Sequence, residues 1–255
     1  MNLTHSRAGN CRKAIFLGDV ERNRAPNQIQ HLMGSRMEVG GNVPINERIT
    51  GVTATDIMEE MQQFTDEHVA TLPPDDQKKF VESLPKEYDG ARRYGDCIDY
   101  DPISTQTSFK MQLKGCKNPV VGKPDVVAKR GTEPLIIDIK RKGARVYKRQ
   151  AEWRLQLALY AIWYMKAHDY SYVPACENHI LIPGANPQII NQDINSDDMY
   201  GAMERLQQLQ KNIDENYWPL SRDSFLCDPK WCWHYNDCHS RYTMSSDDIL
   251  ENFTC

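Results

Sequence analysis

Two acidic residues and one lysine have the types and spacing that phosphoryl chemistry needs. Asp125 ends the stretch Gly-Lys-Pro-Asp, and Asp138 follows Leu-Ile-Ile, with Lys140 two residues further on. If both stretches are strands joined by a turn, the carboxylates converge and Lys140 shares a face with Asp138. Hard divalent cations such as Mg²⁺ or Mn²⁺ bind carboxylate oxygens. The lysine could then orient or help deprotonate a water and offset charge that develops on phosphorus.

The apolar residues before Asp138 predict that this carboxylate starts in or beside the core. An unpaired charge there is costly, and a bound cation is a natural compensation. The alternative for Asp-x-Lys taken alone is an ordinary ion pair at a strand end. The preceding Gly122 to Asp125 stretch and the helix that follows favour a cation site.

That helix is expected over residues 147 to 168, and it places Gln156 and Tyr160 on one side because they are four residues apart. A single tyrosine on such a helix is typical of a core. Gln156 lies between Leu155 and Leu157, so its amide needs hydrogen-bond partners. A site filled with water and phosphate would provide them.

The elements that must position these residues alternate between helices and strands. We expect helices over 11–17 and 29–39, and a helical pattern over 53–84 that is capped at Thr55-Asp56 and interrupted by Pro73 and Pro74. After Pro85 the pattern changes to strands over 107–115, 120–129 and 134–142. After the helix at 147–168 come a hairpin-like strand pair (179–184 and 188–194) and a helix from a cap at Ser196 to Tyr217. The fold class is therefore α/β (α+β), with a small mixed sheet flanked by helices.

Composition favours a globular protein that binds no membrane. The chain has 255 residues and a net charge of −4, and no run approaches the length of about 18 apolar residues that spans a bilayer. A soluble cytosolic location is the default. A basic run follows Lys140 and is either a solvated face or, beside a catalytic site, a track for phosphates. Its candidate phosphate-binding residues are Lys142, Arg145, Lys148 and Arg149.

Eight cysteines are distributed unevenly, and three of them lie between positions 227 and 238. In a reducing compartment, clustered thiols more often bind metal than form disulfides. Ordinary buried, reduced thiols are a sufficient account of Cys97, Cys116 and Cys176. The C-terminal trio instead favours a metal or cluster site.

In these motifs the chain resembles the PD-(D/E)xK nucleases, in particular the RecB-like exonuclease branch. Pro124-Asp125 and Asp138-Ile139-Lys140 match the signature, and QLALY at 156–160 looks like that branch's Q-x-x-x-Y element. The resemblance covers about residues 6 to 238, apart from a helical insertion over 53–100. It implies a restriction-endonuclease-like core in which Asp125 and Asp138 bind Mg²⁺ or Mn²⁺. Lys140, Gln156 and Tyr160 would complete the catalytic set.

The branch usually has a further acidic or histidine ligand on an early helix, shortly after a glycine. Glu38, four residues after Gly34, is the candidate here. His31 and Glu47 are alternatives.

A subset of the branch carries an iron-sulfur cluster, as CRISPR-adaptation exonucleases and phage RecB-like exonucleases do. The resemblance implies that one early and three late cysteines hold a [4Fe-4S] cluster, with Zn²⁺ as the alternative. These are Cys11, Cys227, Cys232 and Cys238. Residues 1–255 then form one nuclease domain: an N-terminal segment (1–52), the helical insertion (53–100), the nuclease core (101–217) and a Cys-rich tail (218–255).

The resemblance also implies the activity and its setting. It is hydrolysis of phosphodiester bonds at DNA ends, often of single strands, in recombination, repair, CRISPR adaptation or phage DNA metabolism. The setting is the cytoplasm of a prokaryotic or phage-infected cell, with a helicase or recombination protein as a partner. Two alternatives remain: a non-catalytic DNA-end-binding or scaffold subunit, and a restriction-type endonuclease.

Overall fold

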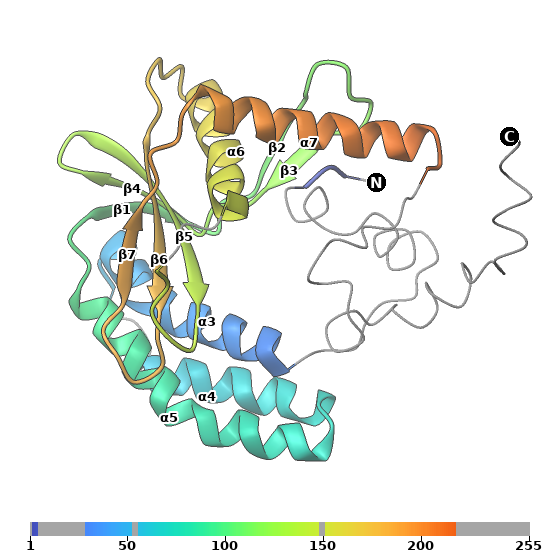
Figure 1. Cartoon of the computed structure of the whole chain (residues 1–255). Helices are drawn as coiled ribbons and strands as arrows, with labels where there is room; N and C mark the ends of the chain where they lie inside the picture. Colours follow the sequence, from blue (N-terminus) through green and yellow to red (C-terminus); the bar gives the residue numbers. More distant parts are fainter. Residues whose placement is uncertain (1, 5–28, 53–55, 148–150, 218–255) are drawn as a thin grey trace, which may run out of the picture.

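The computed structural model describes residues 2–4, 29–52, 56–147 and 151–217 (Figure 1). Its helices are α3 (Ile29–Thr50), α4 (Ile57–His68), the 3-10 helix η2 (Val69–Thr71), α5 (Pro74–Asp96), α6 (Ala151–Ala167) and α7 (Ser196–Asp214). Its strands are β1 (Asp101–Thr105), β2 (Phe109–Met111), β3 (Val120–Gly122), β4 (Val126–Arg130), β5 (Glu133–Arg141), β6 (Ala175–Leu181) and β7 (Gln188–Asn191). The helix expected over 11–17 lies outside the described residues.

Five of the strands form a mixed sheet in the order β1-β4-β5-β6-β7. β5 and β6 are parallel, and every other neighbouring pair is antiparallel. The parallel pair is joined through α6, as a parallel connection requires a crossover. The predicted small mixed sheet flanked by helices is confirmed.

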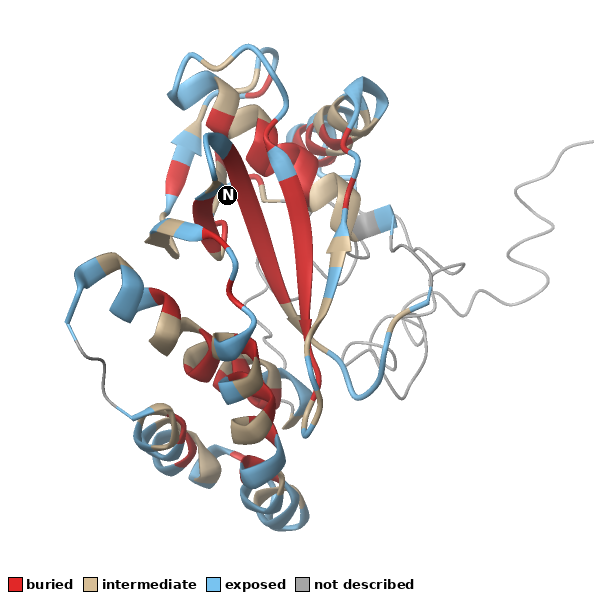
Figure 2. Cartoon of the chain, turned by 90° about the vertical axis from the view of Figure 1, so that its left-hand side faces the viewer, coloured by how far each residue is buried: buried red, intermediate tan, exposed pale blue. Residues whose placement is uncertain are grey.

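Helices cover both faces of the sheet (Figure 1). One core joins α6 and α7 to Val127 and Ile136, and the other joins α3 and α5 to Leu135 and Ile137. Strands β5 and β6 are buried along most of their length between these layers (Figure 2). Because side chains alternate along a strand, Asp138 and Lys140 share the face of Ile136, which α6 covers. In the part of the chain that the structure describes, no helix is long and apolar enough to cross a membrane.

The predicted change to strands after Pro85 is wrong. Helix α5 continues through Pro85 to Asp96, and β1, which was not expected, follows it. A proline inside a helix removes one backbone hydrogen bond. The buried face of α5 nevertheless runs on from Leu84 to Tyr94, and burial of that face offsets the cost. Similarly, α3 passes through Pro44 and ends at Thr50 instead of the expected 39.

The single strand predicted over 120–129 is in fact two. β3 pairs with β2 in a separate two-stranded sheet, whereas β4 belongs to the central sheet. The chain leaves one sheet for the other at Lys123 to Asp125, and Pro124 lacks the N–H that a continuous central strand needs. Asp125 therefore stands immediately before β4.

The predicted cap of α4 is confirmed, whereas the predicted ends of α6 and α7 differ from those in the structure. Asp56 caps α4 as predicted, since its side chain accepts a hydrogen bond from Met58 N at 2.6 Å. Helix α7 is capped by Asn195, one residue before the predicted Ser196, in a reciprocal capping box with Asp198. It ends at Asp214. Helix α6 begins at Ala151, and Tyr147 is exposed outside it.

A buried ionic network joins helices α3, α4 and α5 to the end of β5. Arg36 of α3 is fully buried and donates to Glu87 Oε2 of α5 (Nε, 2.9 Å) and to Thr65 Oγ1 of α4 (Nη1, 2.9 Å). Arg141, the last residue of β5, donates to Glu87 Oε1 at 2.9 Å. Glu87 thus connects the helical layer to the strand that carries Asp138 and Lys140.

A second network surrounds Glu177 of β6. Arg130 donates to both carboxylate oxygens of Glu177 (2.7 and 3.2 Å), and His179 Nε2 lies 2.8 Å from Oε2. His179 Nδ1 lies 2.8 Å from the Tyr94 hydroxyl. Burial raises the pKa of Glu177, but hydrogen bonds from His179 and Arg130 outweigh it and bring the pKa from 4.5 to about 2.

Glu177→Gln is expected to reduce stability above pH 4.5 and to flatten the loss of stability in acid. A carboxyl group whose pKa is lowered by folding stabilises the folded state at any pH above its ordinary pKa. For Glu177 this stabilisation disappears as the pH falls from 4.5 through about 2. Arg130 is 39% exposed, so solvent screens the pair and the effect at neutral pH is about 1–2 kcal/mol. Urea unfolding between pH 7 and pH 2.5 measures it. The exposed Glu204→Gln is the control, and parallel acid profiles for all three proteins would contradict the assignment.

Candidate active site

Asp138 and Lys140 meet on one face of β5. Asp138 is 1% exposed, and its Oδ1 accepts a hydrogen bond from Lys140 Nζ at 2.7 Å. Its Oδ2 accepts from Asn178 Nδ2 of the neighbouring strand at 2.8 Å. Asn178 is directly opposite Asp138 in the β5/β6 register, and Gln192 Nε2 in turn donates to Asn178 Oδ1 at 2.8 Å. The predicted placement of both side chains on one face is confirmed.

Asp125 reaches the same place from the start of β4. Its Oδ2 accepts a hydrogen bond from the backbone N–H of Ile139, the residue after Asp138, at 2.7 Å. Its Oδ1 accepts from Gln106 Nε2 at 3.0 Å. The two aspartates therefore come from adjacent antiparallel strands and meet beside Lys140, as the spacing predicts.

Helix α3 adds a third carboxylate. Glu38 Oε1 accepts a hydrogen bond from the same Gln106 amide nitrogen at 2.6 Å. The Gln106 amide therefore bridges Glu38 and Asp125. His31 and Glu47, the alternatives on this helix, are exposed, and of the three it is Glu38 that lies at the site.

The three carboxyl groups resist ionisation. Burial, followed by the charges of Asp138 and Glu38, raises the pKa of Asp125 to about 7. Burial also raises the pKa of Asp138 and of Glu38. For Lys140, burial lowers the pKa, but the neighbouring Asp138 outweighs this and the net shift is upward. The single ammonium group of Lys140 therefore contacts Asp138 and lies near two further carboxyl groups, those of Asp125 and Glu38.

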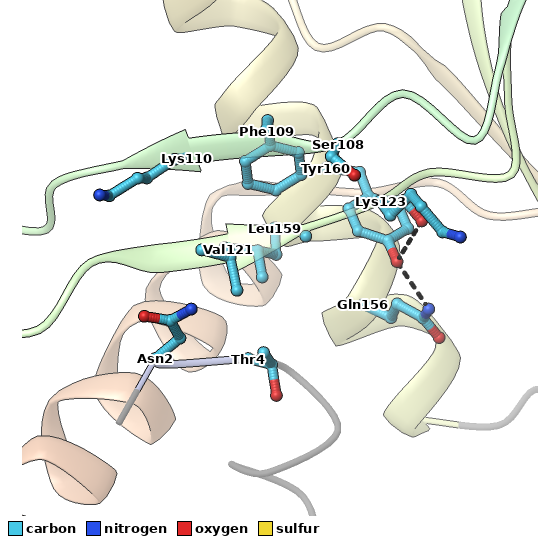
Figure 3. A pocket seen from close by; sticks show the side chains of 11 residues that line it. Asn2, Thr4, Ser108, Phe109, Lys110, Val121, Lys123, Gln156, Leu159 and Tyr160 are labelled. Carbon is cyan, nitrogen blue, oxygen red and sulfur yellow. Dashed lines mark hydrogen bonds between the residues drawn. The ribbon is translucent and has the colours of Figure 1, made fainter.

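Gln156 and Tyr160 lie side by side on α6, next to the carboxylates. Gln156 Nε2 donates to the Tyr160 hydroxyl at 2.9 Å, and this hydroxyl donates to the backbone oxygen of Lys123 at 3.2 Å (Figure 3). The Tyr160 ring belongs to the core and packs edge-on against Phe109. The predicted common side of the helix is confirmed, and the amide of Gln156 has found a partner.

The basic run divides into structural and exposed members. Arg141 is held by Glu87. Lys142 and Arg145 are exposed, and Lys142 Nζ lies 5.4 Å from the centre of the Trp153 ring. Lys148 and Arg149 lie outside the described residues. A role of this run in DNA binding stays a prediction.

The cysteines of the predicted cluster, Cys11, Cys227, Cys232 and Cys238, also lie outside the described residues. Cys255 lies outside them as well. The three cysteines within the described residues are free thiols, of which Cys116 and Cys176 are buried as expected. The expectation of burial is wrong for Cys97, which is exposed after the end of α5. Burial raises the pKa of Cys176 to about 12, so this thiol stays protonated.

Sequence reasoning missed Gln106 and Asn178. Gln106 has a backbone φ of 51°, which is uncommon for a residue other than glycine. No pattern in the sequence predicts such a conformation at a glutamine. Asn178 would have been identifiable as a partner of Asp138 only if the β5/β6 register had been known.

Oxygen donors of this kind fit a hard divalent cation. Among the described residues, no three His, Cys, Asp or Glu side chains form a ready-made metal-binding group. The reason is visible in the contacts, because the Gln106 amide lies between Glu38 and Asp125, and Lys140 holds Asp138. If all three carboxyls ionise against one ammonium, the site carries an excess of negative charge in a buried place. A divalent cation would compensate that charge, so Asp125, Asp138 and Glu38 are suitable ligands.

A match to a family model agrees with this geometry. A family model for the PD-(D/E)XK nuclease superfamily matches residues 47–240, a range that contains the candidate site except Glu38. A Eubacterium rectale protein provisionally assigned as an exonuclease has a similar structure, with a TM-score of 0.50 and 11% identity over 89% of this chain and 86% of that one. The structure of SSO0001 gives a TM-score of 0.37 with 12% identity, over 89% of this chain and 94% of that one. The search of curated proteins gives no match.

Proposed function

This chain belongs to the PD-(D/E)XK nuclease superfamily, and we propose that it is a metal-dependent DNA exonuclease of the RecB-like branch. One observation carries the proposal. Asp125 and Asp138 come from neighbouring strands and meet beside the ammonium group of Lys140. The Q-x-x-x-Y pair, Gln156 and Tyr160, lies next to them on α6 and supports the choice of branch.

Asp125 and Asp138, with Glu38, would hold one or two Mg²⁺ or Mn²⁺ ions. Such ions would polarise a phosphate oxygen and lower the pKa of a water molecule, which makes that water a better nucleophile toward phosphorus. Lys140, held 2.7 Å from Asp138, is placed to orient the attacking water and to offset negative charge on the phosphate. Gln156 and Tyr160 would position the DNA strand.

Digestion from DNA ends is the form of the reaction that we propose. The structurally similar Eubacterium rectale protein is provisionally assigned as an exonuclease, and the Q-x-x-x-Y element is typical of the end-digesting branch. The setting would be recombination, repair, CRISPR adaptation or phage DNA metabolism, with a helicase or recombination protein as a partner. Lys142, Arg145, Lys148 and Arg149 would contact phosphates beyond the cleavage site.

We also propose that Cys11, Cys227, Cys232 and Cys238 hold a [4Fe-4S] cluster. Four thiolates are what this cluster requires, and Zn²⁺ is the alternative occupant. Iron and zinc analysis of protein purified without air separates the two.

Digestion of labelled DNA tests the activity. Linear DNA labelled at one end and closed circular DNA are each incubated with Mg²⁺, Mn²⁺ or EDTA. We expect the linear DNA to be degraded with either metal, the circle to stay intact, and EDTA to stop the reaction. Cleavage of the circle would favour a restriction-type endonuclease. Binding of ends without any cleavage would favour a non-catalytic subunit.

A further inference from the structure

A pocket opens beside the carboxylates and shares two residues with the candidate site. It has a volume of about 590 Å³, and Gln156 and Tyr160 form part of its wall. Figure 3 shows that the β2–β3 pair, helix α6 and the N-terminal residues Asn2 and Thr4 surround it. A group that leaves the carboxylates along Tyr160 therefore enters this pocket.

The walls of the pocket combine flat or branched apolar groups with positive charges. Phe109, Val121, Leu159 and the Tyr160 ring supply the apolar surface. Phe109 is fixed by stacking on Trp163, with ring centres 4.9 Å apart and planes at 9°. Rigid apolar walls of this kind suit an aromatic base, which gains free energy when it packs on an aromatic ring.

Glycine at position 122 makes this wall possible. A Cβ there would lie 2.4 Å from Phe109 Cζ and 3.1 Å from Tyr160 Cε1, so any side chain would push both rings out of place. Strand β3 thus passes close against the two aromatic rings that line the pocket. The shape of the pocket is therefore set by the packing of the β2–β3 pair against helix α6.

Two lysines add positive charge to the lining. Lys110 of β2 and Lys123 of the β3–β4 connection line the pocket and are exposed to solvent. Lys123 stands two residues before Asp125, and its backbone oxygen accepts a hydrogen bond from the Tyr160 hydroxyl at 3.2 Å, so it lies at the carboxylate end of the pocket. Lysines at two ends of an apolar pocket suit the phosphates that flank a nucleotide (Figure 3).

We propose that this pocket receives the base and sugar of one unpaired nucleotide of a DNA strand whose neighbouring phosphate lies at the carboxylates. This inference rests on the proposed function and adds the substrate class of the same site. A base enclosed by β2, β3 and α6 is detached from its complementary strand, so the pocket selects single-stranded ends. Lys110 and Lys123 hold the phosphates on either side.

Binding of a short fluorescein-labelled single strand, followed by anisotropy, tests the proposal. Each position of the probe is replaced in turn by an abasic residue, and all proteins carry Asp138→Asn so that the probe survives. We expect one position to weaken binding roughly tenfold when its base is removed. Phe109→Leu should weaken binding of the intact probe and make it insensitive to that abasic position.

Lysine variants separate the base contact from the phosphate contact. Lys110→Ala should weaken intact and abasic probes equally and reduce the salt dependence of binding. Lys114→Ala, an exposed lysine after the same strand and outside the pocket, is the matched control and should leave binding unchanged.

The outcomes distinguish this inference from the proposed function. If the wild-type protein degrades DNA but its Asp138→Asn variant shows no position-dependent abasic effect, the pocket assignment alone is overturned. A protein that cuts no DNA and still shows the abasic effect, removed by Phe109→Leu, supports the pocket and overturns the nuclease proposal. A duplex probe that binds as tightly as the single strand also overturns the pocket assignment.

Discussion

Asp138→Asn is expected to lower the proposed rate of DNA hydrolysis about a thousandfold, because it removes one of the two aspartate carboxylates that would hold the cation. Loss of a metal ligand forfeits several kcal/mol of transition-state stabilisation, and each 1.4 kcal/mol is about a factor of ten. Asparagine has nearly the same shape and keeps an oxygen for Asn178 or Lys140. Single-turnover digestion of end-labelled DNA at saturating Mg²⁺ measures the rate.

The stability of this variant distinguishes a catalytic defect from misfolding. Asp138 is buried among other acidic groups, and its pKa is raised mainly by burial. Removal of its charge is therefore expected to leave the melting temperature unchanged or to increase it. Asp101→Asn, an exposed residue of β1, is the matched control and should keep full activity. A variant at Asp138 that folds and cuts as fast as the wild type would refute its assigned role.

Glu87→Gln is expected to cost about 3–5 kcal/mol of folding free energy, because it leaves the buried Arg36 without its counter-charge. Both residues are fully buried, and Arg141 loses the same partner. For a chain of this size such a loss lowers the melting temperature by about 10 °C or more. Calorimetry or urea unfolding measures it.

A control on the same helix isolates the effect of burial. Glu82 is 62% exposed in a surface pair with Lys78, so Glu82→Gln should change stability by less than about 0.5 kcal/mol. If both substitutions cost the same, the network around Glu87 does not hold α3, α4 and α5 to β5. If Glu87→Gln also slows DNA cleavage, that would show that this attachment supports the placement of Lys140.

The sequence predicted the parts of the site that depend on local periodicity. The convergence of Asp125 and Asp138, and the common face of Asp138 and Lys140, followed from strand alternation and a short turn. The pairing of Gln156 with Tyr160 followed from the helical repeat. These relations need only residues that are near one another along the chain, and the structure confirms their geometry.

Relations that depend on tertiary packing could not be predicted. Gln106 bridges Glu38 and Asp125 only because β1 pairs with β4, and β1 itself was missed. Pro85 was taken as the end of helical structure, whereas the buried face of α5 carries the helix past it. The split between β3 and β4 places Asp125 at a crossing between two sheets, and no alternation of side chains signals that crossing.

The pocket beside Tyr160 also depends on tertiary packing and could not be predicted from the sequence. Its walls come from the N-terminal residues, the β2–β3 pair and α6, which are far apart in the sequence. A glycine at position 122 is an ordinary turn residue in the sequence. Only its contact with the rings of Phe109 and Tyr160 gives it a role.

The position of a bound cation tests the central claim most directly. Crystals of the protein grown with Mn²⁺ give an anomalous difference map in which the metal is located independently of the protein atoms. We expect a peak within about 2.5 Å of carboxylate oxygens of both Asp125 and Asp138, and no such peak in Asp138→Asn crystals. Wild-type crystals that bind Mn²⁺ elsewhere and show no peak between these two carboxylates would contradict the account.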